Sequence, residues 1–290
     1  MTIRQEADLR RRRDTVVFVA TVLVNLALFL LAILLIEHGS AWLDQYPRLA
    51  KRAQDVRALA IALLAAPPAL VFLRHRRRSL AAGNGLRLSD KQLPDLYRTL
   101  VRYCDRLGQR EIPSLYIAEP AKGYSEAFAA WHHEFIVIRP VYFIAPLEEV
   151  RPIYEFWIGR ELGRIRLGHT RWWEELLVAY VVKLPLLRNP LLHARTYAYD
   201  RYGAYLAPDS IRGLIVFASG RQILKLVDVP AFVAQAESHR GFWPWLSNLT
   251  RSEPHVTFRL RALMDAGLFP RESAALQTTN DIPAPRRASA

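Results

Sequence analysis

The middle of the chain carries the stretch Gly159-Arg160-Glu161-Leu162-Gly163-Arg164-Ile165-Arg166-Leu167-Gly168-His169. It closes a segment that we expect to form one long helix over residues 147–167, with Gly168 as its stop. Because residues four apart share a helical face, Arg160 and Arg164 lie one turn apart beside Glu161. The stretch therefore puts two guanidinium groups and a carboxylate on one face of a helix.

The spacing of these three residues is that of His-Glu-x-x-His, a helix that binds zinc through two imidazoles while its Glu acts on the metal-bound water. Glu161 keeps the place of that Glu, whereas Arg160 and Arg164 replace both histidines. An arginine side chain stays protonated, has no lone pair to offer and repels a dication. We therefore expect that this helix does not bind zinc in the usual way.

Other segments surround this helix in an order that resembles the HtpX-type membrane zinc peptidases, the family that includes the CAAX prenyl endopeptidases. They are Leu86-Arg87-Leu88 with residues 92–97, Ile112–Ile117, Ser125–Ala129 with Phe135–Ile138, Ala194–Ala204, and Ser252–His255 with Arg259–Leu263. The resemblance implies an α+β, mostly helical fold, with a zincin-like peptidase domain and a small β-sheet at residues 80–270.

The resemblance also assigns roles to single residues. Arg160, Arg164 and Thr196 stand at the three positions that bind zinc in the family, while Glu161 and Asp200 stand at the general base and at the acid that supports the ligands. Without a metal, Glu161 has no polarised water to deprotonate. The resemblance therefore implies a pseudopeptidase without a cofactor, in which Glu161 and Asp200 are vestigial.

Arg160 and Arg164 need acidic partners whether they replace zinc ligands or serve the structure alone. Asp200 and Glu126 are the acids that we expect near Arg160 and Arg164, in a buried ionic cluster that docks two helices. A shifted metal site that uses His169, His193 and Asp200 stays open as an alternative. It would make the protein a working metalloendopeptidase with a non-standard site.

The segment with Glu126, Ala127 and Phe128 corresponds to the edge strand of the family, with Glu126 where an Asn is usual. The resemblance implies that this strand borders a groove, where it can capture an extended peptide by strand addition. We therefore expect a protein or peptide partner. A structural subunit of a membrane complex is a further alternative.

Two apolar stretches precede this domain, within residues 1–79. Residues 15–36 are 22 in a row without a charge, enough to cross a hydrocarbon core of about 30 Å, and too long for the core of a signal peptide. Residues 58–73 are a shorter uncharged run that contains Pro67 and Pro68. We expect a membrane hairpin with spans at about 15–36 and 55–73, with a re-entrant or interfacial second helix as the alternative.

Arginines flank both stretches and give the expected orientation. They are Arg10, Arg11, Arg12 and Arg13 before the first stretch, and Arg74, Arg76, Arg77 and Arg78 after the second. Because such flanks stay in the cytoplasm, we expect a multi-pass protein of the inner (cytoplasmic) membrane with a cytoplasmic domain. The flanks account for much of the net charge of +13 through contact with membrane lipid, and no nucleic-acid-binding module is evident, so we expect no nucleic acid partner.

Three further stretches carry weaker predictions. Residues 172–187 are apolar enough for a buried or membrane-contacting helix, but too short for a third full span. The aromatic cluster at residues 242–246 is expected to pack in the core or in a lid. The tail at residues 271–290 has no periodic apolar pattern and is expected to be disordered.

Overall fold

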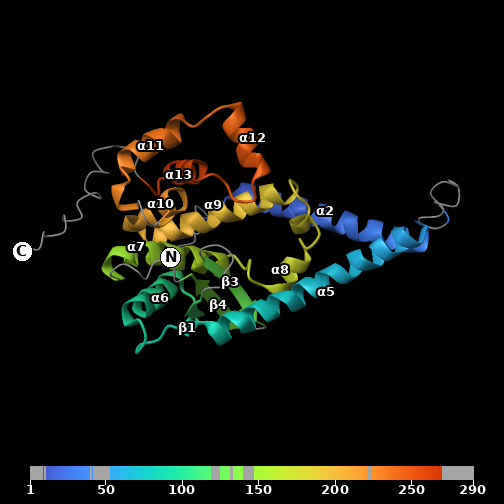
Figure 1. The fold of residues 1–290 in the computed structure, drawn as a ribbon, viewed down its shortest axis with the longest axis horizontal. Coiled ribbons are helices and arrows are strands. Elements are labelled where there is room, and N and C mark those ends of the chain that lie inside the picture. The colour runs from blue at the N-terminus through green and yellow to red at the C-terminus, as the bar shows by residue number, and fades with distance from the viewer. Residues whose placement is uncertain are drawn as a thin grey trace, which may run out of the picture.

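The computed structural model describes residues 9, 11–39, 41, 53–118, 125–130, 133–139, 147–220 and 224–269. The fold is mostly helical with one small mixed sheet (Figure 1), so the expected class is right at this level. Arg10 and the tail at residues 271–290 lie outside the described residues.

Four short strands form the sheet: β1 (Leu86–Arg87), β2 (Ser114–Ile117), β3 (Ser125–Ala130) and β4 (His133–Ile138). Their order is β1-β2-β4-β3, with β4 parallel to β2 and antiparallel to β3. The strands predicted around residues 115–118 and 135–138 are thus confirmed. Within the described part of the chain β3 pairs with β4 alone, which makes it the edge strand that the sequence predicts.

Helix α7 (Leu147–Arg166) confirms the long helix predicted over residues 147–167, and the chain leaves it through Gly168 at a φ of 76°. Glycine adopts this left-handed conformation readily because it has no Cβ. The other helices that follow β1 are α6 (Pro94–Leu107), α8 (Trp172–Leu176), α9 (Arg188–Leu206), α10 (Arg212–Ser219), α11 (Val229–Ser238), α12 (Phe242–Thr250) and α13 (Val256–Met264), with short 3-10 turns η2 (Val181–Lys183), η3 (Pro208–Ser210) and η4 (Leu224–Leu226).

Helices α7 and α9 pack closely at the centre of the domain. A Cβ atom built on Gly163 would lie 2.4 Å from the Cβ of Tyr202, so only glycine fits there. One turn earlier, a Cβ on Gly159 would lie 3.3 Å from the Cα of Gly203. This close approach of two backbones brings the charged side chains of both helices within reach of one another.

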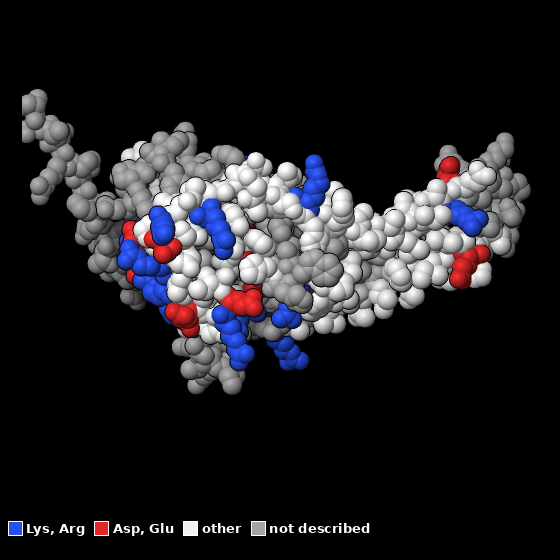
Figure 2. Space-filling view, turned by 90° about the horizontal axis from the view of Figure 1, so that it is seen from below, with Lys and Arg blue, Asp and Glu red and all other residues white. Residues whose placement is uncertain are grey.

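Two long helices, α2 (Arg12–Glu37) and α5 (Ala53–Asn84), pack against each other and project from the domain as an arm (Figure 1). Figure 2 shows this arm without Lys, Arg, Asp or Glu over most of its length on the face in view. Arg201 of α9 ties the start of the arm to the domain, because its Nε donates to the Leu9 carbonyl at 2.7 Å and its guanidinium pairs with Asp14.

Among the described residues, α2 is the one helix long and apolar enough to cross a membrane, and it contains the predicted first span. The second span is not supported, so the structure does not support a multi-pass protein. Helix α5 continues through residues 74–78 to Asn84, and its uncharged run of residues 58–73 covers only about 24 Å at 1.5 Å per residue.

Two other predictions need correction. Residues 172–187 do not form one helix, because α8 ends at Leu176 and only the short turn η2 follows before α9. The aromatic cluster is not in the core, because Phe242, Trp243 and Trp245 of α12 are 61%, 74% and 52% exposed. Both features put large apolar side chains on the surface.

Candidate functional site

A cavity of about 990 Å³ lies beside β3 and is lined by residues from segments far apart in the sequence. Its walls include Ser125 and Glu126 of β3, Arg160, Glu161 and Arg164 of α7, Thr196 and Tyr199 of α9, the stretch Glu253-Pro254-His255, and Arg259 of α13. Helices α10 and α11 complete it through residues such as Phe217 and Gln235. The residues singled out on α7, α9 and β3 thus come together at one place.

Asp200 is the centre of the ionic cluster behind this cavity, and its side chain is only 1% exposed. Arg160 donates from Nε to Oδ1 at 2.9 Å, as the sequence predicts. Arg259 donates from Nε to Oδ2 at 2.6 Å and from Nη2 to Oδ1 at 2.7 Å. Burial acts to raise the pKa of Asp200, but the charges of Arg259 and Arg160 outweigh burial and lower this pKa below its ordinary value.

Glu161 is buried at 2% exposure and points into the cavity. Ser125 at the start of β3 donates to its Oε1 at 2.7 Å. The guanidinium groups lie farther away, with Arg160 Nη1 at 3.9 Å from Oε1 and Arg164 Nη1 at 3.8 Å from Oε2. Oε2 has no hydrogen-bond partner among the described residues, so this buried oxygen has an unused acceptor position.

Arg164 lies nearer the mouth of the cavity, with its side chain 24% exposed. Burial acts to lower its pKa, but Tyr199, Glu161 and Glu126 raise the pKa above its ordinary value. Glu126 thus acts on Arg164 through its charge, in the neighbourhood that the sequence predicts. Arg164 contributes a permanent positive charge to the wall of the cavity.

The donor set at the cavity does not fit a zinc ion. Arg160 and Arg164 offer only donors, and the two oxygens of Asp200 are taken by Arg160 and Arg259. Thr196, at the third ligand position of the resemblance, is 5% exposed and also lines the cavity. In the described ranges no group of three His, Cys, Asp or Glu side chains is placed to hold a metal ion.

The histidines of the alternative metal site have other partners. His169 Nδ1 lies 3.0 Å from the Tyr199 hydroxyl. His193 donates from Nε2 to the Arg251 carbonyl at 2.8 Å, which removes that nitrogen from metal binding. Burial lowers the pKa of His193 below its ordinary value, although this hydrogen bond and Glu253 act in the opposite direction. The structure therefore does not bring His169, His193 and Asp200 into one site.

The edge strand β3 borders the cavity with its first residues. Its side chains Ala127 and Phe128 are 0% and 4% exposed, so they pack inside the domain and do not line the cavity. Strand addition uses the main chain, so the assignment of Ala127 and Phe128 to a peptide groove stays a prediction. A peptide at this edge would meet the backbone of β3 together with the side chains of Ser125 and Glu126.

The arginines of the predicted membrane anchor are described in part. Arg11, Arg12, Arg13 and Arg76 are described and all four are exposed, as a contact with anionic lipid requires. The side chains of Arg74, Arg77 and Arg78 lie outside the described part of the structure, like Arg10.

Sequence reasoning missed Arg259 as a partner of Asp200, and it missed the contribution of α10 and α11 to the cavity. A signal for Arg259 was present, since it belongs to a segment that carries the resemblance. Comparisons of the chain with protein-family models, with curated proteins and with solved structures give no match.

Proposed function

We propose that the protein is a membrane-anchored pseudopeptidase of the HtpX type, which faces the cytoplasm and binds extended peptide segments without cleaving them. The observation that carries the proposal is the convergence of β3, α7, α9, residues 253–255 and Arg259 on one cavity. These are the segments on which the resemblance rests. In this proposal Arg160, Arg164 and Thr196 occupy the places of zinc ligands.

The cavity and the edge strand together supply what an extended peptide needs. An added strand forms main-chain hydrogen bonds along an unpaired edge, and its alternate side chains enter pockets beside that edge. The partly exposed guanidinium of Arg164 can donate to a peptide carbonyl or carboxylate, and Ser125 and Glu126 line the cavity beside it.

The same groups do not hydrolyse a peptide bond in this proposal. Glu161 lies between two permanent cations and has no polarised water to deprotonate. Arg160 holds Asp200 and is therefore a structural element of the wall. The function that remains is recognition.

The arm would hold this site at the membrane. Helix α2 crosses the bilayer in the proposal, and α5, whose uncharged run is shorter, packs beside it and brings the chain back to the same side. The arginines Arg11, Arg12, Arg13 and Arg76 then contact anionic headgroups on the cytoplasmic side. This places the cavity next to the cytoplasmic membrane surface.

A binding experiment tests recognition. Fluorescein-labelled β-casein, an unstructured polypeptide, is titrated with the purified full chain in detergent micelles, and fluorescence anisotropy is recorded. Ala218→Trp fills the cavity that Ala218 lines and should weaken binding about tenfold, equal to roughly 1.4 kcal/mol. Ala234→Trp is the matched control, because Ala234 is exposed on α11 and does not line the cavity. Equal binding by both variants, or fragments of casein that vanish with a chelator, would overturn the proposal.

A second experiment tests the correspondence with zinc ligands. The triple variant Arg160→His, Arg164→His and Thr196→Glu should take up about one zinc ion per chain, because it recreates a His, His, Glu donor set. Circular dichroism reports whether the variant is folded, and elemental analysis reports the metal. A folded variant that takes up no zinc would show that these positions do not correspond to the family's ligands.

A further inference from the structure

The segment Trp172–Leu187, which we call the wedge, is bonded to the middle of α2. Asn25 of α2 is buried at 7% exposure and bonds the wedge backbone on both sides. Its Nδ2 donates to the Leu176 carbonyl at 3.3 Å, and its Oδ1 accepts from the Tyr180 amide at 2.8 Å. One polar side chain thus holds the break between α8 and η2.

The position of Asn25 along α2 fixes the depth of the wedge. Asn25 follows Thr15, the first residue of the uncharged stretch, by ten residues. At 1.5 Å per residue it lies about 15 Å into a hydrocarbon core that is about 30 Å thick. If α2 crosses the bilayer, Leu176 and Tyr180 therefore lie near the level of its centre.

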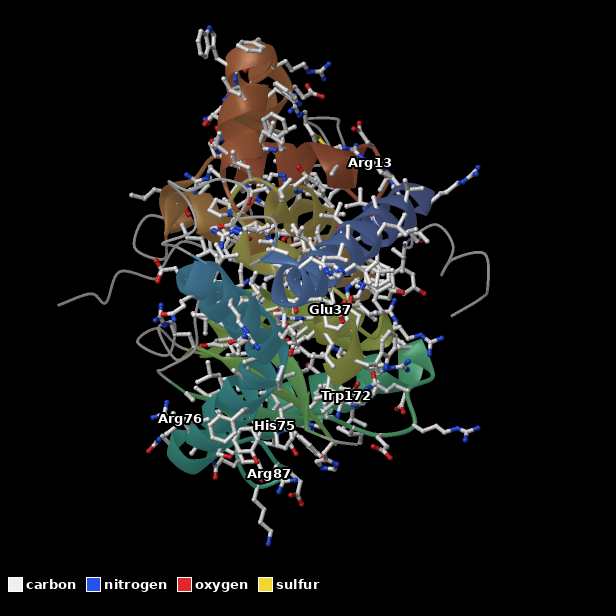
Figure 3. All side chains as sticks on the ribbon, turned by 90° about the vertical axis from the view of Figure 1, so that its right-hand side faces the viewer. Arg13, Glu37, His75, Arg76, Arg87 and Trp172 are labelled. Atoms are coloured by element: carbon white, nitrogen blue, oxygen red, sulfur yellow. The ribbon has the colours of Figure 1, made fainter. Side chains whose placement is uncertain are left out.

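The wedge has two faces of different exposure. Its buried apolar side chains are Val178, Ala179, Tyr180 and Val181, all at 6% exposure or less. Its outward side chains are Trp172, Trp173, Leu177, Leu184, Leu186 and Leu187, which are 36–57% exposed. Helix α8 contacts α5, and η2 contacts α2 and α9. The outward face is therefore apolar and lies alongside the arm, which Figure 3 shows end-on with Trp172 labelled.

Most backbone amides of the wedge donate to partners within the protein. The amides of Val178, Ala179, Val182, Lys183 and Leu184 donate to carbonyls within the wedge. At the break, the side chain of Asn25 accepts from the Tyr180 amide and donates to the Leu176 carbonyl. Irregular backbone is tolerated at membrane depth only where protein satisfies it in this way.

The charges of the wedge are compatible with a position in the bilayer. Glu174 is buried and pairs with Arg195 of α9. Lys183 is exposed, and a lysine near the membrane can extend its flexible stem toward the headgroups. Glu175 is half-buried and acts through its charge on Arg164 of α7. The wedge therefore carries an internal ion pair, one half-buried acid that faces the charge of Arg164, and one long cationic side chain.

We propose that the wedge enters the cytoplasmic half of the bilayer as a re-entrant segment, so that the domain itself is partly embedded in lipid. Leu177, Leu184, Leu186 and Leu187 contact acyl chains, and Trp172 and Trp173 lie on the headgroup side of them. This inference rests on the membrane anchoring by α2 in the proposed function, but not on peptide binding.

The exposed aromatic residues of α12 fit the same membrane boundary. Asn189, two residues after the wedge, donates from Nδ2 to the Leu249 carbonyl at the end of α12. Helix α12 lies on the half of the domain toward the arm (Figure 1), and its exposed Phe242, Trp243 and Trp245 then form a second aromatic contact. Aromatic side chains with a polar atom favour the headgroup level.

Spin labels on single cysteines test the depth of the wedge. The background is Cys104→Ser in the full chain, reconstituted into vesicles of phosphatidylcholine and phosphatidylglycerol. Labels at Leu184 and Leu186 are compared with Leu23, an outward residue of α2 near the level of Asn25, and with Ala234 on α11. We expect Leu184 and Leu186 to resemble Leu23, with frequent collisions with oxygen and a loss of collisions with a water-soluble nickel complex.

The two controls separate the possible failures. If the nickel complex reaches Leu184 and Leu186 as often as Ala234 while Leu23 stays in lipid, the wedge does not enter the bilayer. The anchoring of the protein by α2 would remain valid. Nickel access at Leu23 as well would overturn the anchor and the wedge together.

A pair of variants on α2 tests the role of Asn25. Asn25→Leu removes both bonds to the wedge, so the label at Leu184 should become more mobile. Thr21→Val is the matched control, since Thr21 is also buried but bonds only the Val17 carbonyl of its own helix. Equal mobility of the label in both variants would contradict the role of Asn25.

Discussion

Arg259 holds Asp200 through two parallel hydrogen bonds of 2.6 and 2.7 Å, across 59 residues of chain. Arg160 bonds the same carboxylate from α7 at 2.9 Å. A single buried acid of α9 thereby joins α7 and α13. A bidentate contact of this kind depends on the planar guanidinium, which lysine does not reproduce.

Replacement of Arg259 should therefore destabilise the fold strongly. Arg259→Leu leaves Asp200 buried with one cation, and loss of one partner from a buried ion pair costs about 3–5 kcal/mol. Arg98→Leu is the control, since Arg98 forms an exposed ion pair with Asp95 and should change stability by at most about 1 kcal/mol. Thermal unfolding in detergent measures both. Similar melting temperatures for the two variants would contradict a structural role of Arg259.

The two arginines of the α7 motif should differ in their contribution to stability. Arg160 is buried and bonds Asp200, so Arg160→Leu should cost about 3–5 kcal/mol. Arg164 is 24% exposed and lies 3.8 Å from Glu161, so Arg164→Leu should cost less, about 1 kcal/mol. Chemical denaturation of both variants gives the order. A larger loss for Arg164→Leu would reverse the structural assignment.

Gly163 should tolerate no side chain, in contrast to another helical glycine. Gly163→Ala would drive a Cβ to 2.4 Å from the Cβ of Tyr202 and push α7 from α9, at a cost of about 1–3 kcal/mol or more. A methyl group on Gly83 would meet no atom within 4 Å, so Gly83→Ala in α5 should be neutral or stabilise by up to about 1 kcal/mol. Melting temperatures that fall equally in both variants would contradict this difference.

Much of the local structure follows from the sequence, because it depends on neighbouring residues. The long helix α7 with its stop at Gly168, the strands β2 and β4, and the edge segment β3 are predicted by local patterns. The contact of Arg160 with Asp200 is predicted by the resemblance together with the charges on α7 and α9. The helix and the strands need no knowledge of distant packing, whereas the contact of Arg160 with Asp200 depends on the resemblance.

Long-range contacts account for the errors. The wedge has the composition of a helix, but the side chain of Asn25 bonds its backbone at the break, 151 and 155 residues away. Arg259 reaches Asp200 only because α13 packs against α9. The exposure of Trp243 also depends on how α12 packs against the rest of the domain, and the apolar composition of residues 242–246 does not predict this packing.

His193 should make stability depend on pH in mildly acidic solution. Its pKa is lowered in the fold by burial, so between this value and the ordinary value of about 6.5 the unfolded chain binds more protons than the folded one. The stabilisation is complete above about pH 6.5 and is lost as the pH falls toward the folded pKa. The pKa of His255 is also lowered by burial, so it contributes in the same direction.

His193→Gln removes this titration and keeps a donor for the Arg251 carbonyl that accepts from Nε2. Melting temperatures of both proteins are compared at about pH 7.5 and about pH 5.5, on either side of the ordinary histidine pKa. The native protein should lose more stability on acidification than His193→Gln, whose remaining loss reflects His255 and the other titrating groups. An identical loss in both proteins would mean that His193 takes up a proton as readily in the fold as in the unfolded chain. It would contradict the prediction that burial lowers the pKa of His193.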